Sequence, residues 1–235
     1  MRIDPKAAPT SRRIHKRGQK KKVHLIAPGK CRGMIQAESR LEVSGAIAMA
    51  LDPRVVSFRP QPITFDLATG RGYNHKADLT AQASKISTHK RIYTPDFEVT
   101  FPRGKVYIEF KHSGIIRRAP EVLMLPNILA RYGHRLILID ESYLPETFVQ
   151  NSRLLHIATK TRIDPEASKA ILTDCEKPML IGNLCAQGYS QNFVLALVAS
   201  GGLTCDLATS RLTPKTSVIK SAHAQHLMQL PFHNV

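Results

Sequence analysis

The sequence predicts an α/β protein with a mixed sheet, followed by a smaller domain of helices and short strands. Two strand-like runs meet at the turn Pro102-Arg103-Gly104, and an apolar strand at residues 135–140 follows a helical stretch. Beyond residue 160 the pattern changes to three short helices and two strand-like runs. With 235 residues, 43% of them hydrophobic, the chain can bury one large core or two modest ones.

The first regular element is a helix over residues 37–51, which the pair Asp52-Pro53 ends. Small and apolar residues surround most of this helix, so much of its surface should be buried. Glu38 and Glu42 share one face at i, i+4 spacing. An acid on a largely buried helix is expected to face something specific.

The segment after this helix is less regular. Short strands are expected at residues 55–58 and 63–67, with Gln61 between them as a structural or substrate-positioning residue. Residues 68–90 are polar and contain glycines, which indicates a loop or an irregular hairpin.

The clearest strand pair comprises Phe97–Phe101 and residues 105–110. Side chains alternate along a strand, which places Glu109 and Lys111 on one face of the sheet. Asp96 directly precedes the first strand of the pair. The hairpin is therefore expected to gather Asp96, Glu109 and Lys111 at one edge of the sheet.

A helix over residues 119–132, ended by Gly133 and kinked or delayed by Pro126, leads to the apolar strand at 135–140. An apolar run of this kind is typical of a strand that is buried on both faces. Strand, helix and strand in this order predict a right-handed crossover and a parallel pair.

The second domain is expected to contain helices at residues 165–173, 178–187 and 190–200, and strand-like runs at 203–207 and 216–219. Three helices and a hairpin are the elements of a winged helix. The third helix carries no Lys or Arg, although a DNA-reading helix normally aims such side chains at base edges. This domain is therefore interpreted as a domain that binds a protein partner.

The net charge of +16 is concentrated near the N-terminus, because residues 1–35 contain eleven Lys or Arg and a single acid, Asp4. Such a segment repels itself and releases counterions when it lies along phosphates. We therefore expect residues 1–33 to be a poorly ordered basic arm that contacts the nucleic-acid backbone. A solvated tail without a specific partner, or a sorting signal, is the alternative.

Cysteine and hydropathy patterns bear on location. Four widely spaced cysteines without a C-x-x-C pair argue against a zinc site or a disulfide framework and favour a reducing cytoplasm. The sequence contains no run of 18 apolar residues, and no apolar segment follows the basic N-terminus. Neither a membrane span nor a secretory signal is therefore expected.

Asp96, Glu109 and Lys111 match the needs of metal-dependent phosphodiester cleavage. Two carboxylates with backbone oxygen and water suit Mg²⁺, which activates a water molecule and neutralises phosphate charge. An amine such as that of Lys111 can stabilise charge that develops in the transition state. The alternative is that Asp96 ends a turn and that the second strand presents an ordinary solvated face. His112 is interpreted as a core histidine with its hydrogen bonds satisfied.

Five segments of the chain carry a more specific signal: Glu38-Ser39-x-Leu41-Glu42, Leu51-Asp52-Pro53-x-Val55, Gln61-Pro62, Tyr93-Thr94-Pro95-Asp96-Phe97 and Val106-Tyr107-Ile108-Glu109-Phe110-Lys111. In this order, within residues 35–140, they resemble the TnsA endonuclease family, the end-cleaving subunits of heteromeric cut-and-paste transposases. The resemblance implies a restriction-endonuclease-like (PD-(D/E)xK) core. The second half is similar to that family's winged-helix-like C-terminal domain in the order of its elements.

The resemblance also implies roles for single residues. Glu42, Asp96, Glu109 and Lys111 would be catalytic, and Asp96, Glu109 and the backbone carbonyl of Phe110 would be metal ligands. Some members of the family carry Gln at the position of Glu109. The implied cofactor is Mg²⁺, with two ions bound and Mn²⁺ as a substitute.

The implied activity is a nick at the 5′ end of each transposon strand, complementary to the 3′ cuts of a partner DDE-type transposase. The transposon-end DNA and an ATP-dependent regulator are further implied partners, in a bacterial cytoplasm at the nucleoid. The domains are then a basic arm (1–33), an endonuclease domain (34–160) and a winged-helix-like partner-interaction domain (161–235). Two alternatives stay open: a stand-alone restriction or repair nuclease of the same fold, and an inactive basic DNA-binding scaffold.

Overall fold

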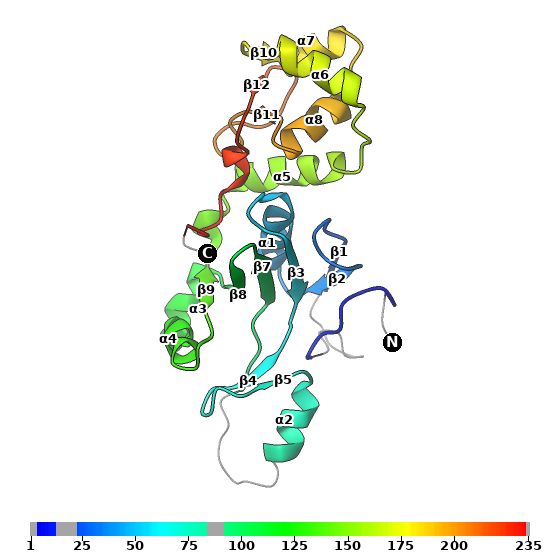
Figure 1. Ribbon diagram of the computed structural model, residues 1–235. Helices are drawn as coiled ribbons and strands as arrows, with labels where there is room; N and C mark the ends of the chain where they lie inside the picture. The colour runs from blue at the N-terminus through cyan, green and yellow to red at the C-terminus, as the bar shows by residue number, and fades with distance from the viewer. Residues whose placement is uncertain (1–3, 13–22, 84–91, 234–235) are drawn as a thin grey trace. The chain divides into compact units, whose positions relative to one another are not determined.

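The computed structural model describes residues 4–12, 23–83 and 92–233 of a mixed α/β protein (Figure 1). The chain divides into two compact units. The first comprises Met1–Ala46, Val55–Glu141 and His233–Val235, and the second comprises Ile47–Arg54 and Ser142–Phe232. Within the described ranges, no helix is both long and apolar enough to cross a membrane.

The main sheet of the first unit has four strands in the order β3-β7-β8-β9 (Figure 1). Strands β3 (Ser57–Pro60), β7 (Phe97–Phe101) and β8 (Gly104–Phe110) are antiparallel, whereas β9 (Leu136–Ile139) runs parallel to β8. The predicted hairpin, the predicted parallel pair and the mixed sheet are confirmed. Strand β3 begins at Ser57, later than the strand expected at residues 55–58.

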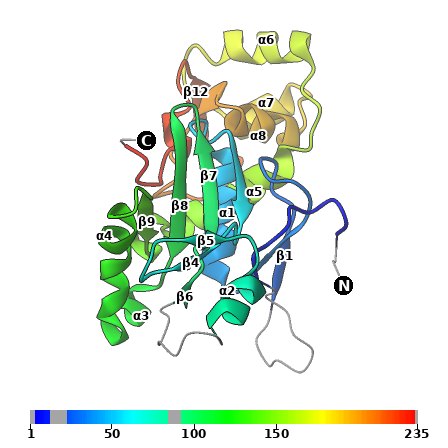
Figure 2. The same ribbon diagram turned by 60° about the horizontal axis from the view of Figure 1, so that its bottom comes forward.

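Helix α1 (Arg40–Leu51) lies against this sheet and ends where the sequence predicts. Figure 2 shows it beside and partly behind strand β7. Gly45 allows the close approach, because a Cβ at this position would lie 2.1 Å from the ring of Phe110. That ring in turn packs edge-on against Phe97, with the ring centroids 5.9 Å apart. The contact holds the first half of the helix against the end of β8.

Replacing Gly45 by alanine is expected to destabilise the protein, because the new Cβ must displace the Phe110 ring. Overpacking of this kind costs about 1–3 kcal/mol, which outweighs the gain of at most about 1 kcal/mol in helix propensity. Thermal unfolding should show a melting temperature lowered by several degrees. Gly29→Ala is the matched control, since nothing lies within 4 Å of a Cβ at Gly29. Equal melting temperatures for the two variants would contradict the close contact.

A smaller sheet in the first unit has the strand order β5-β4-β6. Its elements, with the helix that accompanies them, are β4 (Thr64–Asp66), β5 (Gly72–Tyr73), α2 (Lys76–Ala83) and β6 (Ile92–Tyr93). The expectation of a loop or an irregular hairpin at residues 68–90 is corrected: β5 pairs with β4, which lies before this range, and α2 follows β5 as a helix. Leu79 is the one buried side chain described in α2, so no apolar periodicity marks this helix. Residues 84–90 of that prediction lie outside the described residues.

The crossover from β8 to β9 consists of three short pieces: α3 (Ser113–Arg118), the 3₁₀ helix η1 (Pro120–Met124) and α4 (Leu125–Ala130). The predicted single helix over residues 119–132 is therefore wrong in its extent. His112 caps α3 by accepting a hydrogen bond from Gly114 N at 3.1 Å, so helical structure begins earlier than expected. Pro120 and Pro126 lie in first turns and divide the remainder.

The N-terminal region is described only in part. Residues 1–3 and 13–22, with most cations of the predicted basic arm, lie outside the described residues. The described parts correct the prediction of poor order: β1 (His24–Ile26) pairs with β2 (Ile35–Ala37), and Asp4 accepts a hydrogen bond from Met34 N at 2.7 Å.

The second unit contains helices and a three-stranded sheet in the order β10-β12-β11. Its elements are α5 (Glu146–Ala158), α6 (Pro165–Asp174), β10 (Met179–Leu180), α7 (Ile181–Ala186), α8 (Gln191–Ala199), β11 (Leu203–Thr204), β12 (Ser217–Lys220) and η3 (Gln225–Leu227). The three predicted helices and both strand-like runs are present, and β10 is an additional strand. Helix α5 packs against α8, so the division between the units falls after Glu141 and not at residue 160.

Candidate active site

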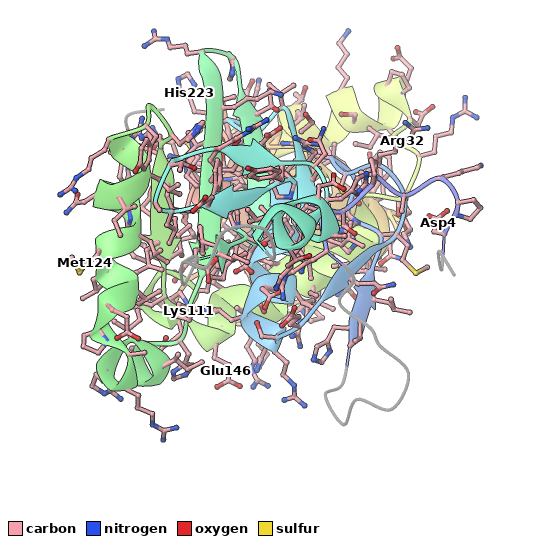
Figure 3. The ribbon with its side chains drawn as sticks, turned by 90° about the horizontal axis from the view of Figure 1, so that it is seen from below. Asp4, Arg32, Lys111, Met124, Glu146 and His223 are labelled. Atoms are coloured by element: carbon pink, nitrogen blue, oxygen red, sulfur yellow. The ribbon has the colours of Figure 1, made fainter. Side chains whose placement is uncertain are left out.

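The structure brings the predicted acids and lysine together in the first unit. Phe97, the first residue of β7, pairs with Ile108 of β8, so Asp96 lies just before β7 at the end of the hairpin where Glu109 follows Ile108. Lys111 follows β8 directly (Figure 3), and Glu42 lies in the first turn of α1. The three acids are each less than 9% exposed. They form one buried acidic cluster with a single lysine beside it.

The backbone of the neighbouring strand holds Asp96. Its Oδ2 accepts a hydrogen bond from Phe110 N at 2.8 Å, and within the described part of the chain none reaches its Oδ1. Burial raises the pKa of Asp96 well above its usual range, and the charges of Glu109 and Glu42 raise it further. The protein alone therefore leaves negative charge at Asp96 only partly compensated.

Glu109 lies between two donors. Its Oε1 forms an ion pair with Lys111 Nζ at 2.8 Å, and its Oε2 accepts a hydrogen bond from the hydroxyl of Tyr93 at 2.9 Å. Burial opposes the charged form of Lys111, but the nearby carboxylates, Glu109 foremost, outweigh burial and raise the pKa of the amine. Lys111 is therefore held as a cation, and Glu109 is fixed in one orientation.

Glu42 has a structural task that the sequence prediction did not include. Its oxygens accept hydrogen bonds from Glu38 N and from the hydroxyl of Ser39, both at 2.9 Å, while Ser39 Oγ accepts one from Glu42 N. This arrangement resembles a capping box at the start of α1, with the carboxylate of Glu42 bonded to the N–H of Glu38 in place of that of Ser39. Burial, followed by the charges of Glu38 and Glu109, raises the pKa of Glu42 in spite of these bonds.

Glu98, a structural acid on β7, has surroundings that differ from those of Asp96. It is as buried as Asp96, but Arg59 binds it through two nitrogens at 3.1 and 3.0 Å, and Lys105 binds it at 3.2 Å. Burial alone would raise the pKa of Glu98, yet these cations lower it. Asp96 instead has like charges as neighbours. An acid that is buried among other acids is typical of a functional site.

The donors suit a divalent cation. Among the described residues, no group of three or more His, Cys, Asp and Glu side chains stands ready to hold a metal ion. Asp96 and Glu109 are both buried, however, and lie close enough for the charge of Glu109 to act on Asp96. Mg²⁺ is commonly bound by one or two carboxylates with backbone oxygen and water. Burial and the charges of Glu109 and Glu42 raise the pKa of Asp96, so its charged form lacks compensation that such an ion would supply. The residues present therefore fit one Mg²⁺ ion.

Two further residues belong to the site. Tyr93, quoted in the sequence motif without a role, donates its hydroxyl to Glu109. Gln61, for which a structural and a substrate-positioning role were both open, is 2% exposed and donates its backbone N–H to the carbonyl of Asp96 at 2.7 Å. Its place favours the structural role. Alternation along a strand cannot reveal the contact of Tyr93, because Thr94 and Pro95 separate it from β7.

The prediction that His112 is a core histidine is wrong. Its side chain is 60% exposed, and its ring nitrogen caps α3 and lies 3.4 Å from Glu141 Oε1. The strand alternation used for the prediction does not apply, because β8 ends at Phe110.

The raised pKa values predict how stability depends on pH and metal. The carboxyls of Asp96 and Glu42 lose their protons at higher pH in the folded chain than in the unfolded chain. Their contribution to stability is therefore full at low pH, below the ordinary carboxyl range, and is lost as pH rises towards the raised values. Mg²⁺ should then raise the melting temperature more at pH 8 than at pH 5, by about 2–4 °C if it recovers ~1 kcal/mol.

Thermal unfolding with and without Mg²⁺ at the two pH values checks this dependence. Glu98→Gln is the control, because Glu98 is paired with cations and should leave the effect of Mg²⁺ unchanged. Equal stabilisation by Mg²⁺ at pH 5 and pH 8 would contradict an unneutralised acidic cluster.

No protein-family model matches the chain, and no curated protein matches it either.

Proposed function

We propose that the chain is a Mg²⁺-dependent DNA endonuclease with a restriction-endonuclease-like core, and that it nicks the 5′ ends of a transposon as one subunit of a transposase. The buried carboxylates of Asp96, just before β7, and of Glu109, near the end of β8, carry the proposal together with Lys111, which is bonded to Glu109. The ordered motifs similar to the TnsA family favour a transposase subunit over a stand-alone nuclease.

In this proposal Asp96, Glu109 and the carbonyl of Phe110 hold the metal. When bound, Mg²⁺ supplies an activated water and neutralises phosphate charge. Lys111 stays protonated, because the carboxylates raise its pKa, and it stabilises charge that develops on the phosphate. Tyr93 and Lys111 hold the two oxygens of Glu109 in place, so the ligand needs little reorganisation.

Glu42 adds negative charge to the site while it caps α1. A direct role as ligand for a second metal ion would require its carboxylate to exchange the hydrogen bonds from Glu38 N and Ser39 Oγ. We therefore propose one firmly held ion, and the second ion implied by the family resemblance would involve movement at the start of α1.

The second unit is proposed to be winged-helix-like and to recruit the partner transposase. Residues 193–199 of α8 are buried, so this helix packs inside its own unit and its apolar side chains face no DNA groove. Helices α6, α7 and α8 with a sheet in the order β10-β12-β11 fit a winged helix. The basic residues near the N-terminus are proposed to contact the DNA backbone without reading sequence.

Strand-specific cleavage mapping tests the function. The substrate is DNA that carries the ends of the element, incubated with Mg²⁺ and this chain, with and without the DDE-type transposase and its regulator. The expected result is a nick at the 5′ end of each strand only in the complete mixture. Cutting by the purified chain alone would favour the stand-alone nuclease. DNA binding without cleavage in every mixture would favour the inactive scaffold.

A further inference from the structure

Residues 4–12, here called the N-terminal strap, are attached to the first unit at several points. At its beginning, Asp4 accepts a hydrogen bond from Met34 N, and Ala8 N donates to the carbonyl of Arg32 at 3.2 Å. Figure 3 shows the labelled Asp4 and Arg32 on the same side of the molecule. The strap is therefore fixed in place before it reaches the neighbourhood of the site.

Ser11 anchors the end of the strap. It is 4% exposed, and all its polar groups are bonded: its N–H donates to the carbonyl of Gln61 at 2.8 Å, and its carbonyl accepts from Lys76 N at 2.8 Å. Its hydroxyl shares a hydrogen bond with that of Thr64 at 2.9 Å, which shares another with Thr94 at 2.8 Å. Ser11 thus joins the strap to the segment that leads into Asp96.

Gln61 carries the contact from Ser11 to Asp96. Its backbone N–H donates to the carbonyl of Asp96, and its own carbonyl accepts from Ser11 N. Gln61 has a φ of 41°, the one positive φ among described residues other than glycine. A side-chain-bearing residue in this region costs on the order of 1 kcal/mol or more and persists only where its surroundings hold it. Ser11 and Asp96 are those surroundings.

Arg12, the next residue of the strap, reaches the other side of the site. Its guanidinium lies 2.7 Å from Glu38 Oε1, and the backbone N–H of Glu38 donates to Glu42 Oε2. Both partners of this ion pair are more than a quarter exposed, so the pair adds little to global stability. Its effect is to fix the place of Glu38 and, through it, the carboxylate of Glu42.

We propose that Arg12 is a positioning residue for the acidic cluster: the strap, locked by Ser11, holds Glu38 so that Glu42 keeps its orientation towards the site. The proposal rests on the endonuclease function proposed above and adds a residue that touches neither metal nor DNA. The competing view is that Arg12 contributes only charge for DNA binding, since Arg13, Lys16 and Arg17 follow it closely in the sequence.

Three variants of the full-length chain separate these views. Arg12→Gln breaks the contact with Glu38, and Arg12→Lys keeps a cation there. Lys6→Gln removes the same charge from the same strap, where no side-chain hydrogen bond of Lys6 is seen in the described part. The measurements are kcat and KM for nicking of end-containing DNA with the partner transposase present, and the Mg²⁺ concentration that gives half-maximal rate.

Arg12→Gln is expected to lower kcat by about tenfold and to raise the Mg²⁺ midpoint, the size typical for loss of a residue that orients a metal ligand. Arg12→Lys should retain most of kcat, and Lys6→Gln should change only KM and the salt dependence. Equal kcat and Mg²⁺ midpoints in Arg12→Gln and Lys6→Gln would overturn the inference and leave the nuclease function standing.

If the wild-type chain does not nick DNA in any mixture, that result instead contradicts the proposed function. The rise in melting temperature with Mg²⁺ concentration then decides the role of Arg12. A midpoint shifted to higher Mg²⁺ in Arg12→Gln supports positioning, whereas an unshifted midpoint, or no effect of Mg²⁺ on the wild type, overturns it.

Discussion

Replacing Asp96 by asparagine is expected to abolish Mg²⁺-dependent nicking while DNA binding persists. The amide keeps the size of the side chain, and its oxygen can still accept the hydrogen bond from Phe110 N. The charge that would hold the metal is lost, so nicking should fall by at least about a hundredfold, the effect of losing one preorganised charge in a water-excluded site. The metal-free variant should be no less stable than the wild type, because like charges surround Asp96.

Glu98→Gln is the matched control for this substitution. Glu98 lies two residues further on, in β7, and is equally buried, but it is bound by Arg59 and Lys105. Its replacement should lower the melting temperature, since it removes the charge that pairs with Arg59 and Lys105, and should leave the nicking rate unchanged. Nicking rates on end-containing DNA and DNA affinity by fluorescence anisotropy give the comparison. Full activity of the Asp96→Asn variant would show that Asp96 is not a metal ligand.

The pair Asp96 and Glu109 could be predicted because it depends on local rules. A Pro-Arg-Gly turn fixes the hairpin register, and alternation then sets the face of each side chain. The same rules fail at the end of the strand: His112 lies beyond β8, where the chain turns into α3. Position along a strand therefore predicted where Asp96 and Glu109 lie, but not where His112 lies.

The remaining contacts of the site join segments that are distant in sequence. Arg12 contacts Glu38, and Tyr93 contacts Glu109, only once the first unit has folded. No periodicity encodes such contacts. Composition was also misleading for the strap, because its basic character suggested a disordered arm although Ser11 is buried and fully hydrogen bonded.

The strand expected to be buried on both faces shows a further limit of sequence patterns. Within the described sheet β9 lies at the edge, and its central residues Ile137 and Leu138 are only half-buried. An apolar run of four residues does not distinguish a central strand from an edge strand. The parallel pairing with β8 was nevertheless predictable, since a helical crossover of this length favours it.

Replacing Lys111 by alanine is expected to lower the nicking rate by about a hundredfold or more, yet to preserve metal binding. Lys111 contributes positive charge and not a metal ligand, so its loss removes stabilisation of the transition state. It also removes a charge that lowers the pKa of Asp96, and the optimum pH for nicking should therefore move upward. Asp96→Asn, by contrast, should lose the stabilisation by Mg²⁺ together with activity.

Lys105→Ala provides the control, because Lys105 lies on β8, the strand that Lys111 follows, is 63% exposed and bonds only to the structural acid Glu98 among the described residues. Nicking rates as a function of pH, together with the Mg²⁺-dependent melting temperature, distinguish the two lysines. A Lys111→Ala variant with the wild-type rate and pH optimum would show that the cation beside Glu109 serves only to balance buried charge. If the Lys111→Ala variant loses activity while Mg²⁺ still stabilises it, Lys111 acts on the phosphate. If Lys111 only balanced charge, its removal would tighten metal binding and would not lower the rate.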